Sequence, residues 1–352
     1  MTHEHDELAS VVRSALADWA PGGSRWVSDP GPGDPERLAA WTVLAGDLQL
    51  AGLTVPESAG GAGDLSDALV VATELGRALL HSPFVASTVR AAAVLSGAGG
   101  QDALLGRIAA GEATVVVADA TLEDGEGLSG DLGRVVSAGD ADAIIVPVST
   151  ADGLGLRLVE TAASGVAVTR SASVDPGWPE DRVMLDGAPS RPVPTAADVA
   201  AVLSSARSAA LLAYSAEAVG AASAALDQAV AYAKQRVQFG EPIGSFQAVQ
   251  HAAADMFVRV ETAGALSRES ALALGRPGVA DEALAATTYL YCTEAALAVA
   301  GQAIQLQGGI GFTWEHSTHR CFKRVAALRS MPATPGPQRE RLLVAIGGGE
   351  LA

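Results

Sequence analysis

The sequence contains little cysteine and few aromatic residues for its length. Its 352 residues include two cysteines, Cys292 and Cys321, and only six Phe, four Tyr and five Trp. Two cysteines cannot form the several cross-links of a disulfide-stabilised secreted scaffold, and their spacing is not that of a zinc site. We therefore expect a cytoplasmic protein that needs no disulfides, and the sequence offers no metal-ligand set.

Basic residues are also scarce relative to acidic ones. The chain has 23 Lys and Arg against 40 Asp and Glu, a formal net charge of −17. A surface of that sign repels nucleic acid and anionic lipid, so neither is an expected partner. The first residues are acidic, unlike a signal peptide. Uninterrupted apolar runs such as 209–213 are far shorter than the roughly 20 residues that span a bilayer.

Aliphatic and small residues, by contrast, are abundant. Hydrophobic residues make up 49% of the chain, which is ample for a core and argues against disorder. At roughly 100–200 residues per domain, the length allows two or three domains. An interior built mainly from Ala, Leu and Val favours helices.

The hydrophobic pattern changes twice along the chain. Residues 1–112 show the apolar spacing of helices, as in 67–80, where Ser66 is the predicted N-cap. Residues 113–194 contain short β-type runs separated by Gly, Asp or Pro at roughly ten-residue intervals, which is typical of a small antiparallel sheet. These runs lie at 113–118, 134–137, 143–148, 154–160, 166–169 and 182–185.

Residues 195–352 are helical again and rich in alanine. Four long helices are predicted, at about 195–235, 245–273, 281–307 and 316–329, with Thr195 as the first N-cap. Four helices of this length, joined by short connections, indicate a bundle.

Two segments of the predicted bundle combine polar side chains with glycine. Arg236 stands at a helix end beside a Gly-Pro-Gly loop, where a guanidinium can clamp a pyrophosphate. Gly308, Gly309 and Gly311 expose backbone that an anionic or planar ligand can approach. From these residues alone, a helical corner with a surface arginine and a glycine-rich helix end is an equally good interpretation.

These segments resemble the two signatures of the acyl-CoA dehydrogenase family. Arg236-Val-Gln-Phe-Gly240 and Ser245-Phe-Gln-Ala-Val-Gln-His251 are similar to the first, and Gln305–Thr313 is similar to the second. Residues 53–63 and 74–77 resemble the family's N-terminal region, so the likeness spans almost the whole chain. It implies a mainly α fold with a central β domain. The expected parts are an N-terminal helical domain (1–112), a small antiparallel β domain (113–194) and a C-terminal four-helix bundle with FAD-binding motifs (195–352).

The resemblance further implies an FAD site shared by two subunits, with an acyl-CoA thioester as substrate. The cofactor-binding residues that it implies are Arg236 for the pyrophosphate, Gln238, Phe239, Ile243 and Gln247 for the ADP half, Gln305, Gly308 and Gly309 for the neighbouring protomer's FAD, and Thr334. A shared site implies a homo- or hetero-tetramer, the latter with a paralogous chain. An electron-transfer flavoprotein is a further candidate partner.

The family's catalytic base has no counterpart at either of its usual positions. A carboxylate must take the Cα proton of the thioester while the Cβ hydride passes to the flavin. The two positions correspond here to Pro332 and Ala210, neither of which can act as a base. Glu217, two helical turns after Ala210, would serve only if the alignment shifts, and its other interpretation is a plain surface or interhelical residue. No catalytic residue is therefore assigned.

The β region also departs from the family. Where the family has a Thr-Glu-Pro-Gly segment against the flavin ring, residues 118–125 read Ala-Asp-Ala-Thr-Leu-Glu-Asp-Gly, and no Trp-Ile-Thr follows between 128 and 148. Our main hypothesis is a base-lacking subunit that completes a partner's FAD site, as in actinobacterial heterotetramers of steroid side-chain degradation. The alternatives are a self-sufficient dehydrogenase with an atypical base and a non-catalytic acyl-CoA or flavin-binding protein.

Overall fold

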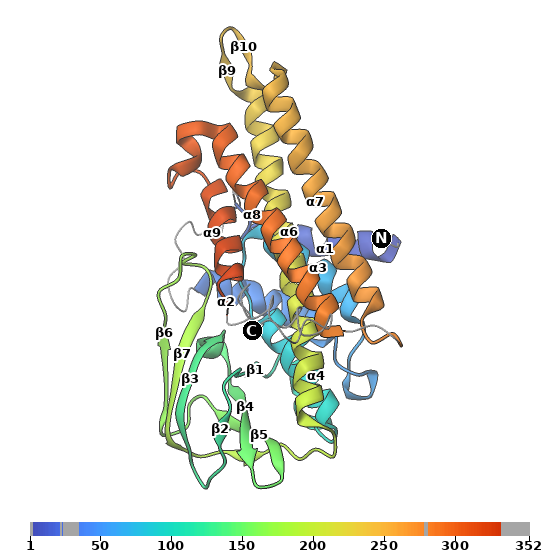
Figure 1. Cartoon of the computed structure of the whole chain (residues 1–352), viewed down its shortest axis with the longest axis vertical. Helices are drawn as coiled ribbons and strands as arrows, with labels where there is room; N and C mark the ends of the chain where they lie inside the picture. Colours follow the sequence, from blue (N-terminus) through green and yellow to red (C-terminus); the bar gives the residue numbers. More distant parts are fainter. Residues whose placement is uncertain (1–2, 22, 24–34, 278–280, 332–352) are drawn as a thin grey trace, which may run out of the picture. The chain divides into compact units, whose positions relative to one another are not determined.

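The computed structural model describes residues 3–21, 23, 35–277 and 281–331, which form two compact units. The first unit comprises Met1–Asp29, Leu69–Leu80 and Leu211–Ala352, and the second comprises Pro30–Ala68 and His81–Ala210. Neither unit is continuous in sequence. Figure 1 labels the helices and strands of both. The division into three domains at residues 112 and 194 stays a prediction.

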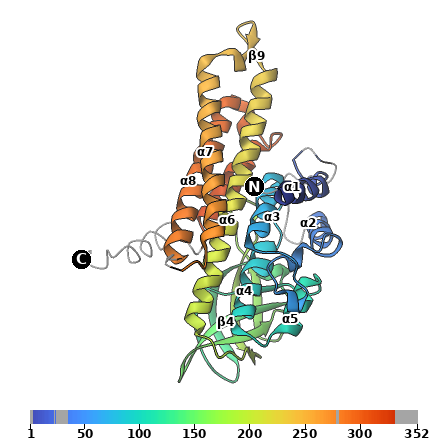
Figure 2. The same ribbon diagram turned by 90° about the vertical axis from the view of Figure 1, so that its right-hand side faces the viewer.

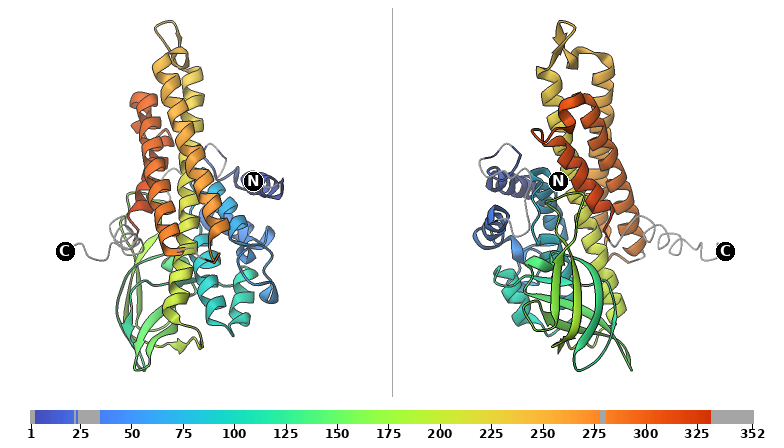
Figure 3. Two further views of the ribbon diagram at one scale, coloured as in Figure 1. Left: turned by 45° about the vertical axis from the view of Figure 1, so that its right-hand side comes forward. Right: turned by 90° about the vertical axis from the view of Figure 1, so that its left-hand side faces the viewer.

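A bundle of long helices forms most of the first unit. Its helices are α6 (Val199–Gln235), α7 (Gln247–Ala273), α8 (Asp281–Gln307) and α9 (Thr318–Arg329), joined by η6 (Ile243–Ser245) and η7 (Gly308–Phe312). All four predicted helices are thus confirmed to within a few residues. α6, α7 and α8 run side by side in every view, with α3 (Leu65–Ala78) beside α6 and α1 (His3–Leu16) lying roughly crosswise to the long helices (Figures 2 and 3).

Two of the helix starts differ from the predicted N-caps. Asp64, and not Ser66, caps α3, because its Oδ1 accepts hydrogen bonds from the backbone N–H groups of Ser66 and Asp67. Asp198, and not Thr195, caps α6 through the N–H groups of Ala200 and Ala201. A carboxylate at this position also complements the helix dipole, which explains why aspartate takes the cap where a hydroxyl residue lies nearby.

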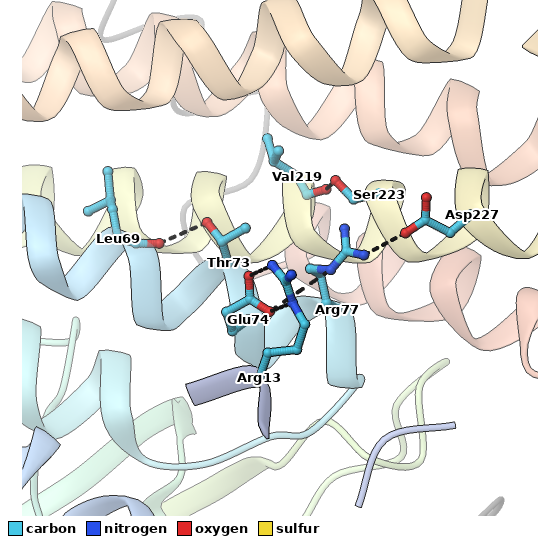
Figure 4. Close-up of polar contacts among 8 residues, drawn as sticks. All are labelled: Arg13, Leu69, Thr73, Glu74, Arg77, Val219, Ser223 and Asp227. Atoms are coloured by element: carbon cyan, nitrogen blue, oxygen red, sulfur yellow. Dashed lines mark hydrogen bonds and ion pairs between the residues drawn. The ribbon is translucent and has the colours of Figure 1, made fainter. Parts of the chain in front are cut away.

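Helices α3 and α6 cross at a pair of glycines. A Cβ added to Gly76 would lie 2.0 Å from the backbone oxygen of Glu217, and one added to Gly220 would lie 1.9 Å from that of Thr73. The two backbones are therefore in direct contact. Ion pairs border the crossing: Arg77 pairs with Asp227 of α6, and the buried Glu74 accepts two hydrogen bonds from Arg13 of α1, at 2.6 and 2.8 Å (Figure 4).

The second unit combines the remaining helices with two sheets. Its helical segments are α2 (Pro35–Thr42), η1 (Val43–Asp47), η2 (Leu50–Gly52), η3 (Glu57–Ala59), η4 (Phe84–Ala91), α4 (Ala92–Ala98), α5 (Asp102–Ala109) and η5 (Ala138–Asp140). Its strands are β1 (Val115–Val117), β2 (Leu122–Glu123), β3 (Leu128–Val136), β4 (Ala143–Thr150), β5 (Gly153–Glu160), β6 (Val166–Arg170), β7 (Glu180–Ala188) and β8 (Arg191–Pro192). All six predicted runs are strands, whereas β2 and β8 were not predicted.

The pairing in these sheets is mostly antiparallel. One sheet has the order β3-β7-β6, and the other has the order β1-β4-β5-β8 with β2 also on β4. The predicted antiparallel arrangement is confirmed for β3, β4, β5, β6 and β7. It is wrong for β1, which pairs parallel with β4. Of the two strands that were not predicted, β2 pairs parallel with β4 and β8 pairs antiparallel with β5.

Strand β4 is buried on both faces, and this explains its apolar run. Ile145 packs with Leu95, Leu105 and Ile108 of the helical layer. Ile144 and Val146 point the other way, into the cluster shared with the β3–β7 sheet. Alternation along a strand sends successive side chains to opposite faces, so a strand between two layers needs apolar residues throughout.

Two helices are longer and more apolar than the short apolar runs suggested. Windows within Val199–Gln235 and Asp281–Phe312 reach the length and hydropathy of a membrane span, and 89% and 56% of these windows are buried inside the protein. The uninterrupted runs underestimated the length and hydropathy of these two helices. Isolated polar residues break the runs, but they do not bring the mean hydropathy below that of a membrane span. A core helix of a bundle meets the same test.

We predict that Gly220→Ala destabilises the protein, because the new methyl group would push α3 and α6 apart. Overpacking of this kind costs about 1–3 kcal/mol. Gly301→Ala on α8 is the matched control, since its Cβ would lie 3.8 Å from Phe322 and alanine favours the helix. Urea unfolding should show a loss only for Gly220→Ala, and equal midpoints for the two variants would contradict the close crossing.

Candidate functional site

The first signature forms a hairpin between α6 and α7. Arg236 directly follows α6, and the strands β9 (Val237–Gln238) and β10 (Glu241–Pro242) pair around Phe239 and Gly240. Both tip residues have positive φ, 57° and 90°, which produces the tight turn. The hairpin holds the Phe239 side chain 95% exposed, with its ring edge-on to that of Phe246.

Five of the predicted cofactor residues belong to this hairpin and its flanks. Arg236, Gln238, Phe239 and Gln247 are exposed, and Ile243 is half-buried in η6. The backbone N–H of Ile243 donates to the oxygen of Arg236 at 2.8 Å, which fixes the base of the hairpin. The Arg236 guanidinium has no hydrogen-bond or ion-pair partner within the described residues.

The second signature ends α8 and forms the turn η7. Gln305 is exposed on the last turn of α8, and the exposed Gly308 and Gly309 follow it. Gly308 has a φ of 64°, and a Cβ at either glycine would meet no atom within 4 Å. This part of the turn therefore offers bare backbone with free space above it. Thr334 lies outside the described residues.

A polar contact joins α6 to the segment that follows η7. Gln228 of α6 lies eight residues, about 12 Å, before Arg236. Its Oε1 accepts hydrogen bonds from Ser317 and Thr318, just after η7, at 2.8 Å each. No hydrogen bond joins the hairpin to η7 within the described residues, so the bundle end presents them as two separate surfaces (Figure 1).

An aromatic hollow adjoins the second signature. It has a volume of about 370 Å³ and is lined by Gly301, Ile304, Gln305, Phe312, Trp314, His319, Phe322 and Lys323. Lys323 Nζ lies 3.9 Å from the centre of the Trp314 ring. Phe312 and Trp314 are 72% and 57% exposed. Large exposed aromatic side chains gathered at one place are typical of a surface that another molecule covers.

Glu217 lies between helices α6 and α9, so it is an interhelical residue, one of the interpretations that the sequence offered. Its carboxylate is buried and accepts a hydrogen bond from Arg324 Nη1 of α9 at 3.0 Å. Nη2 of the same guanidinium donates to the backbone oxygen of Leu79 at 3.0 Å, and Arg324 is wholly buried. An ionised carboxylate neutralised in this way is a poor proton acceptor. Ala210, at one usual position of the base, is also buried. Pro332, at the other, lies outside the described residues.

Sequence reasoning missed Arg324, although its position carried a signal. Cys321, Val325 and Leu328 form the buried stripe of α9, and Arg324 lies on that stripe. A charged residue at a core position of a helix is paired almost without exception. The buried Glu217 at a core position of α6 would have been its natural partner.

The segment at 118–125 is held by charged side chains. Asp119 accepts hydrogen bonds from Arg90 of η4 and from Arg207 of α6. Burial raises the pKa of this carboxyl, but the charges and hydrogen bonds of Arg90 and Arg207 outweigh burial, and the net pKa lies below the usual value. Asp119 is therefore a structural anion in the place where the family resemblance expects flavin-ring contacts.

The chain belongs to the acyl-CoA dehydrogenase family. Residues 205–340 match the family model "Acyl-CoA dehydrogenase, C-terminal domain". The acyl-CoA dehydrogenase IpdE2 of Mycobacterium tuberculosis is 34% identical over 342 residues, which cover 96% of each chain.

Solved structures share the whole fold. The Mycobacterium tuberculosis ChsE4-ChsE5 complex is similar at 26% identity with a TM-score of 0.85, covering 100% of this chain and 99% of that one. The Tcur3481-Tcur3483 steroid ACAD is similar at 28% identity with a TM-score of 0.83, covering 98% of each chain. The predicted fold class is thereby confirmed.

FAD is the cofactor of this family, and other proteins with this fold have been solved with FAD bound. The two signatures fit such a dinucleotide chemically. An unpaired guanidinium suits a pyrophosphate, exposed amides suit ribose and base groups, and open glycine backbone admits a planar or anionic group.

We predict that Arg324→Met strongly destabilises the protein, because it leaves the Glu217 carboxylate buried without a partner. Breaking a buried pair in this way costs about 3–5 kcal/mol. The double variant Glu217→Leu/Arg324→Met removes both charges and should recover most of that loss. Equilibrium urea unfolding of the three proteins measures the difference, and a double variant no more stable than Arg324→Met would contradict the assignment.

Proposed function

We propose that this chain is the base-lacking subunit of a two-chain, FAD-dependent acyl-CoA dehydrogenase. In this proposal it completes the FAD site of a related chain, which supplies the catalytic carboxylate. The proposal rests on a contrast within the first unit. Its two signatures are intact and exposed, whereas Glu217, the glutamate nearest to a usual position of the base, is buried in an ion pair with Arg324.

The missing base supports a partner chain. α,β-Dehydrogenation needs a carboxylate within reach of the Cα proton, and bound FAD accepts the hydride from Cβ. Ala210 has no ionisable group, and Glu217 is committed to an ion pair in the core. A chain of the same fold with a glutamate at one of the two usual positions would provide what this chain lacks.

The cofactor-binding roles follow from the exposed signatures. Arg236 would hold the pyrophosphate, and Gln238, Phe239, Ile243 and Gln247 would line the ADP half. Gln305, Gly308 and Gly309 would contact the FAD of the neighbouring subunit, with Thr334 as a further contact. Each proposed group offers a donor or an open surface, and none of the described ones is occupied by an ion pair within the chain.

The exposed aromatic residues support an oligomer. Phe239 is 95% exposed at the hairpin tip, and Phe312 and Trp314 project beside the hollow near Gln305. Exposing three large aromatic groups next to two cofactor segments is costly in an isolated chain, and a neighbouring subunit would cover them. The ChsE4-ChsE5 complex, of which one chain shares this fold, supports a hetero-oligomer with a paralogous chain.

The proposed substrate is an acyl-CoA thioester that carries a steroid-derived acyl group. This rests on the likeness to the Tcur3481-Tcur3483 steroid ACAD across the whole fold. We place the protein in the cytoplasm, where two buried cysteines that form no disulfide remain reduced. An electron-transfer flavoprotein is the proposed electron acceptor.

We predict that the chain alone oxidises acyl-CoA thioesters very slowly, and that co-expression with a base-carrying chain of the same family restores turnover. Loss of a general base commonly costs about 10²–10⁴ in rate. Dye-coupled turnover with a panel of acyl-CoA thioesters, together with the oligomer mass and flavin content, measures this for the lone chain and the pair.

Two results would contradict this proposal. Robust turnover by the lone chain that disappears in Glu217→Gln would make Glu217 the base and the chain self-sufficient. A lone chain and a pair that both lack flavin would instead favour a non-catalytic binding protein.

We predict that Arg236→Ala weakens FAD retention by the pair, because a charge-assisted hydrogen bond to phosphate is worth about 1.5–3 kcal/mol. The dissociation constant should rise by roughly 10- to 100-fold. Arg259→Ala is the control, since Arg259 is an exposed arginine about 18 Å along α7 from Gln247. Flavin fluorescence during dilution measures the affinity. Equal retention by the two variants would remove Arg236 from the site.

A further inference from the structure

A side chain of α6 tethers the chain that follows the glycine turn η7. Gln228 Oε1 accepts hydrogen bonds from the hydroxyls of Ser317 and Thr318, at 2.8 Å each. The two hydroxyls lie five and six residues after Phe312, the last residue of η7. Arg236 follows Gln228 by eight residues, about 12 Å along α6. Gln228 therefore links the helix that leads to Arg236 with the segment just after the second signature.

The turn itself has an adaptable backbone. Three of the five residues of η7 are glycine, which adopts a wider range of φ and ψ than any other residue. The segment that follows is held by local hydrogen bonds, in which the N–H of Thr313 donates to the oxygen of Ile310 and the N–H of His316 donates to the oxygen of Thr313. These bonds keep residues 310–316 together, so a shift at Ser317 passes on to the glycines.

The two hydroxyls do not need Gln228 in order to be satisfied. Thr318 is fully buried, and its hydroxyl also lies 2.9 Å from Nδ1 of His316, which can accept the same proton. Ser317 is half-buried, so water can take the place of the amide at its hydroxyl. Replacing Gln228 with an apolar residue therefore leaves neither hydroxyl without a partner, but it releases the tether.

We propose that Gln228 is a positioning residue, which holds η7 at the spacing from Arg236 that lets one dinucleotide engage both signatures. This inference rests on the proposed function, with both signatures engaging the one FAD whose site this chain completes. Two contacts to one ligand reinforce each other only when the protein presents them at the matching distance. No hydrogen bond joins the hairpin to η7 within the described residues, so their spacing comes from the helices and from links such as Gln228.

Different effects are expected on a ligand that spans the two signatures and on one that does not. Gln228→Leu should raise the dissociation constant of the pair for FAD by about tenfold, comparable to the loss of one hydrogen bond. Inorganic pyrophosphate can engage Arg236 without engaging the turn, so its affinity should stay at the parental value. A general loss of structure would weaken both ligands, and the comparison therefore separates positioning from a purely structural role.

The experiment uses co-expressed pairs that contain the parent chain, Gln228→Leu, Gln228→Glu or Gln302→Leu. Flavin fluorescence gives the affinity for FAD, and displacement of FAD gives that for pyrophosphate. Gln228→Glu is the conservative rescue, since a carboxylate also accepts from both hydroxyls. Gln302, exposed on α8, is the control for loss of an amide elsewhere. We expect only Gln228→Leu to lose affinity for FAD, with the affinity for pyrophosphate unchanged in all four pairs.

A second variant removes the same tether from its other side. Ser317→Ala/Thr318→Val deletes both donors and should weaken FAD binding by the same factor as Gln228→Leu. Combining all three substitutions should cause no further loss, because the interaction is already absent. Thermal unfolding of each lone chain shows whether it is folded, and the second variant carries the test if Gln228→Leu is not.

The inference fails on any of three results: unchanged FAD affinity in Gln228→Leu, equal losses of FAD and pyrophosphate affinity, or additive losses from the two sides of the tether. A parent pair that retains no more FAD than the partner chain by itself would overturn the proposed function as well. FAD binding that is weakened by Arg236→Ala but not by Gln228→Leu would overturn this inference alone.

Discussion

The ion pair between Glu217 and Arg324 fixes the place where three helices meet. Arg324 brings α9 to the carboxylate of α6 and, through its second nitrogen, to the backbone oxygen of Leu79 at the end of α3. At the same level, Gly76 brings α3 against the backbone of α6. Both signatures extend from helices that this contact holds, so the surfaces that they form depend on this buried charge pair.

Burial makes this arrangement demanding. Two charges removed from water are tolerated only when their geometry and hydrogen bonding are good. Loss of either charge leaves the other buried without a partner, which strongly destabilises the folded state. Leu79 adds to the demand, because it has a positive φ of 52°, a conformation that favours glycine. Its N–H donates to the oxygen of Gly76, the N–H of Leu80 donates to the oxygen of Leu75, and Arg324 Nη2 donates to the oxygen of Leu79 itself. The guanidinium thereby fixes the residue at which the chain leaves α3.

The parts of the fold with a clear period were predictable from the sequence. The four bundle helices and the six β runs follow from apolar spacing, since each element buries one face or, like β4, both. The parallel pairing of β1 was not predictable, because a run of three valines has no signal for strand direction. The N-caps were misplaced by a few residues, because an aspartate near a serine or threonine offers two good caps and the backbone selects one.

The candidate site was predictable to a different extent. Exposed residues such as Arg236 and Gln305 appear in recognisable motifs, so the sequence locates them directly. Arg324 appears in no motif that suggests a role. Its importance comes from burial, which depends on which helices pack against α9, and no local pattern states that. A polar residue on an otherwise apolar helix stripe is the signal that would have drawn attention to it.

The bond between Arg324 and Leu79 also sets an order of events during synthesis. The two residues are 245 positions apart, and the unit that contains them draws α1 and α3 from the beginning of the chain and α7 to α9 from its end. At a translation rate of about 5–20 residues per second, the end of α3 waits on the order of ten seconds or more for its cap. During that time the Leu79 carbonyl lacks its guanidinium donor, although α1 and α6, which contact Glu74 and Gly76, are synthesised earlier. The first unit must therefore mature after most of the chain has left the ribosome, and nascent chains truncated before α9 should be chaperone clients.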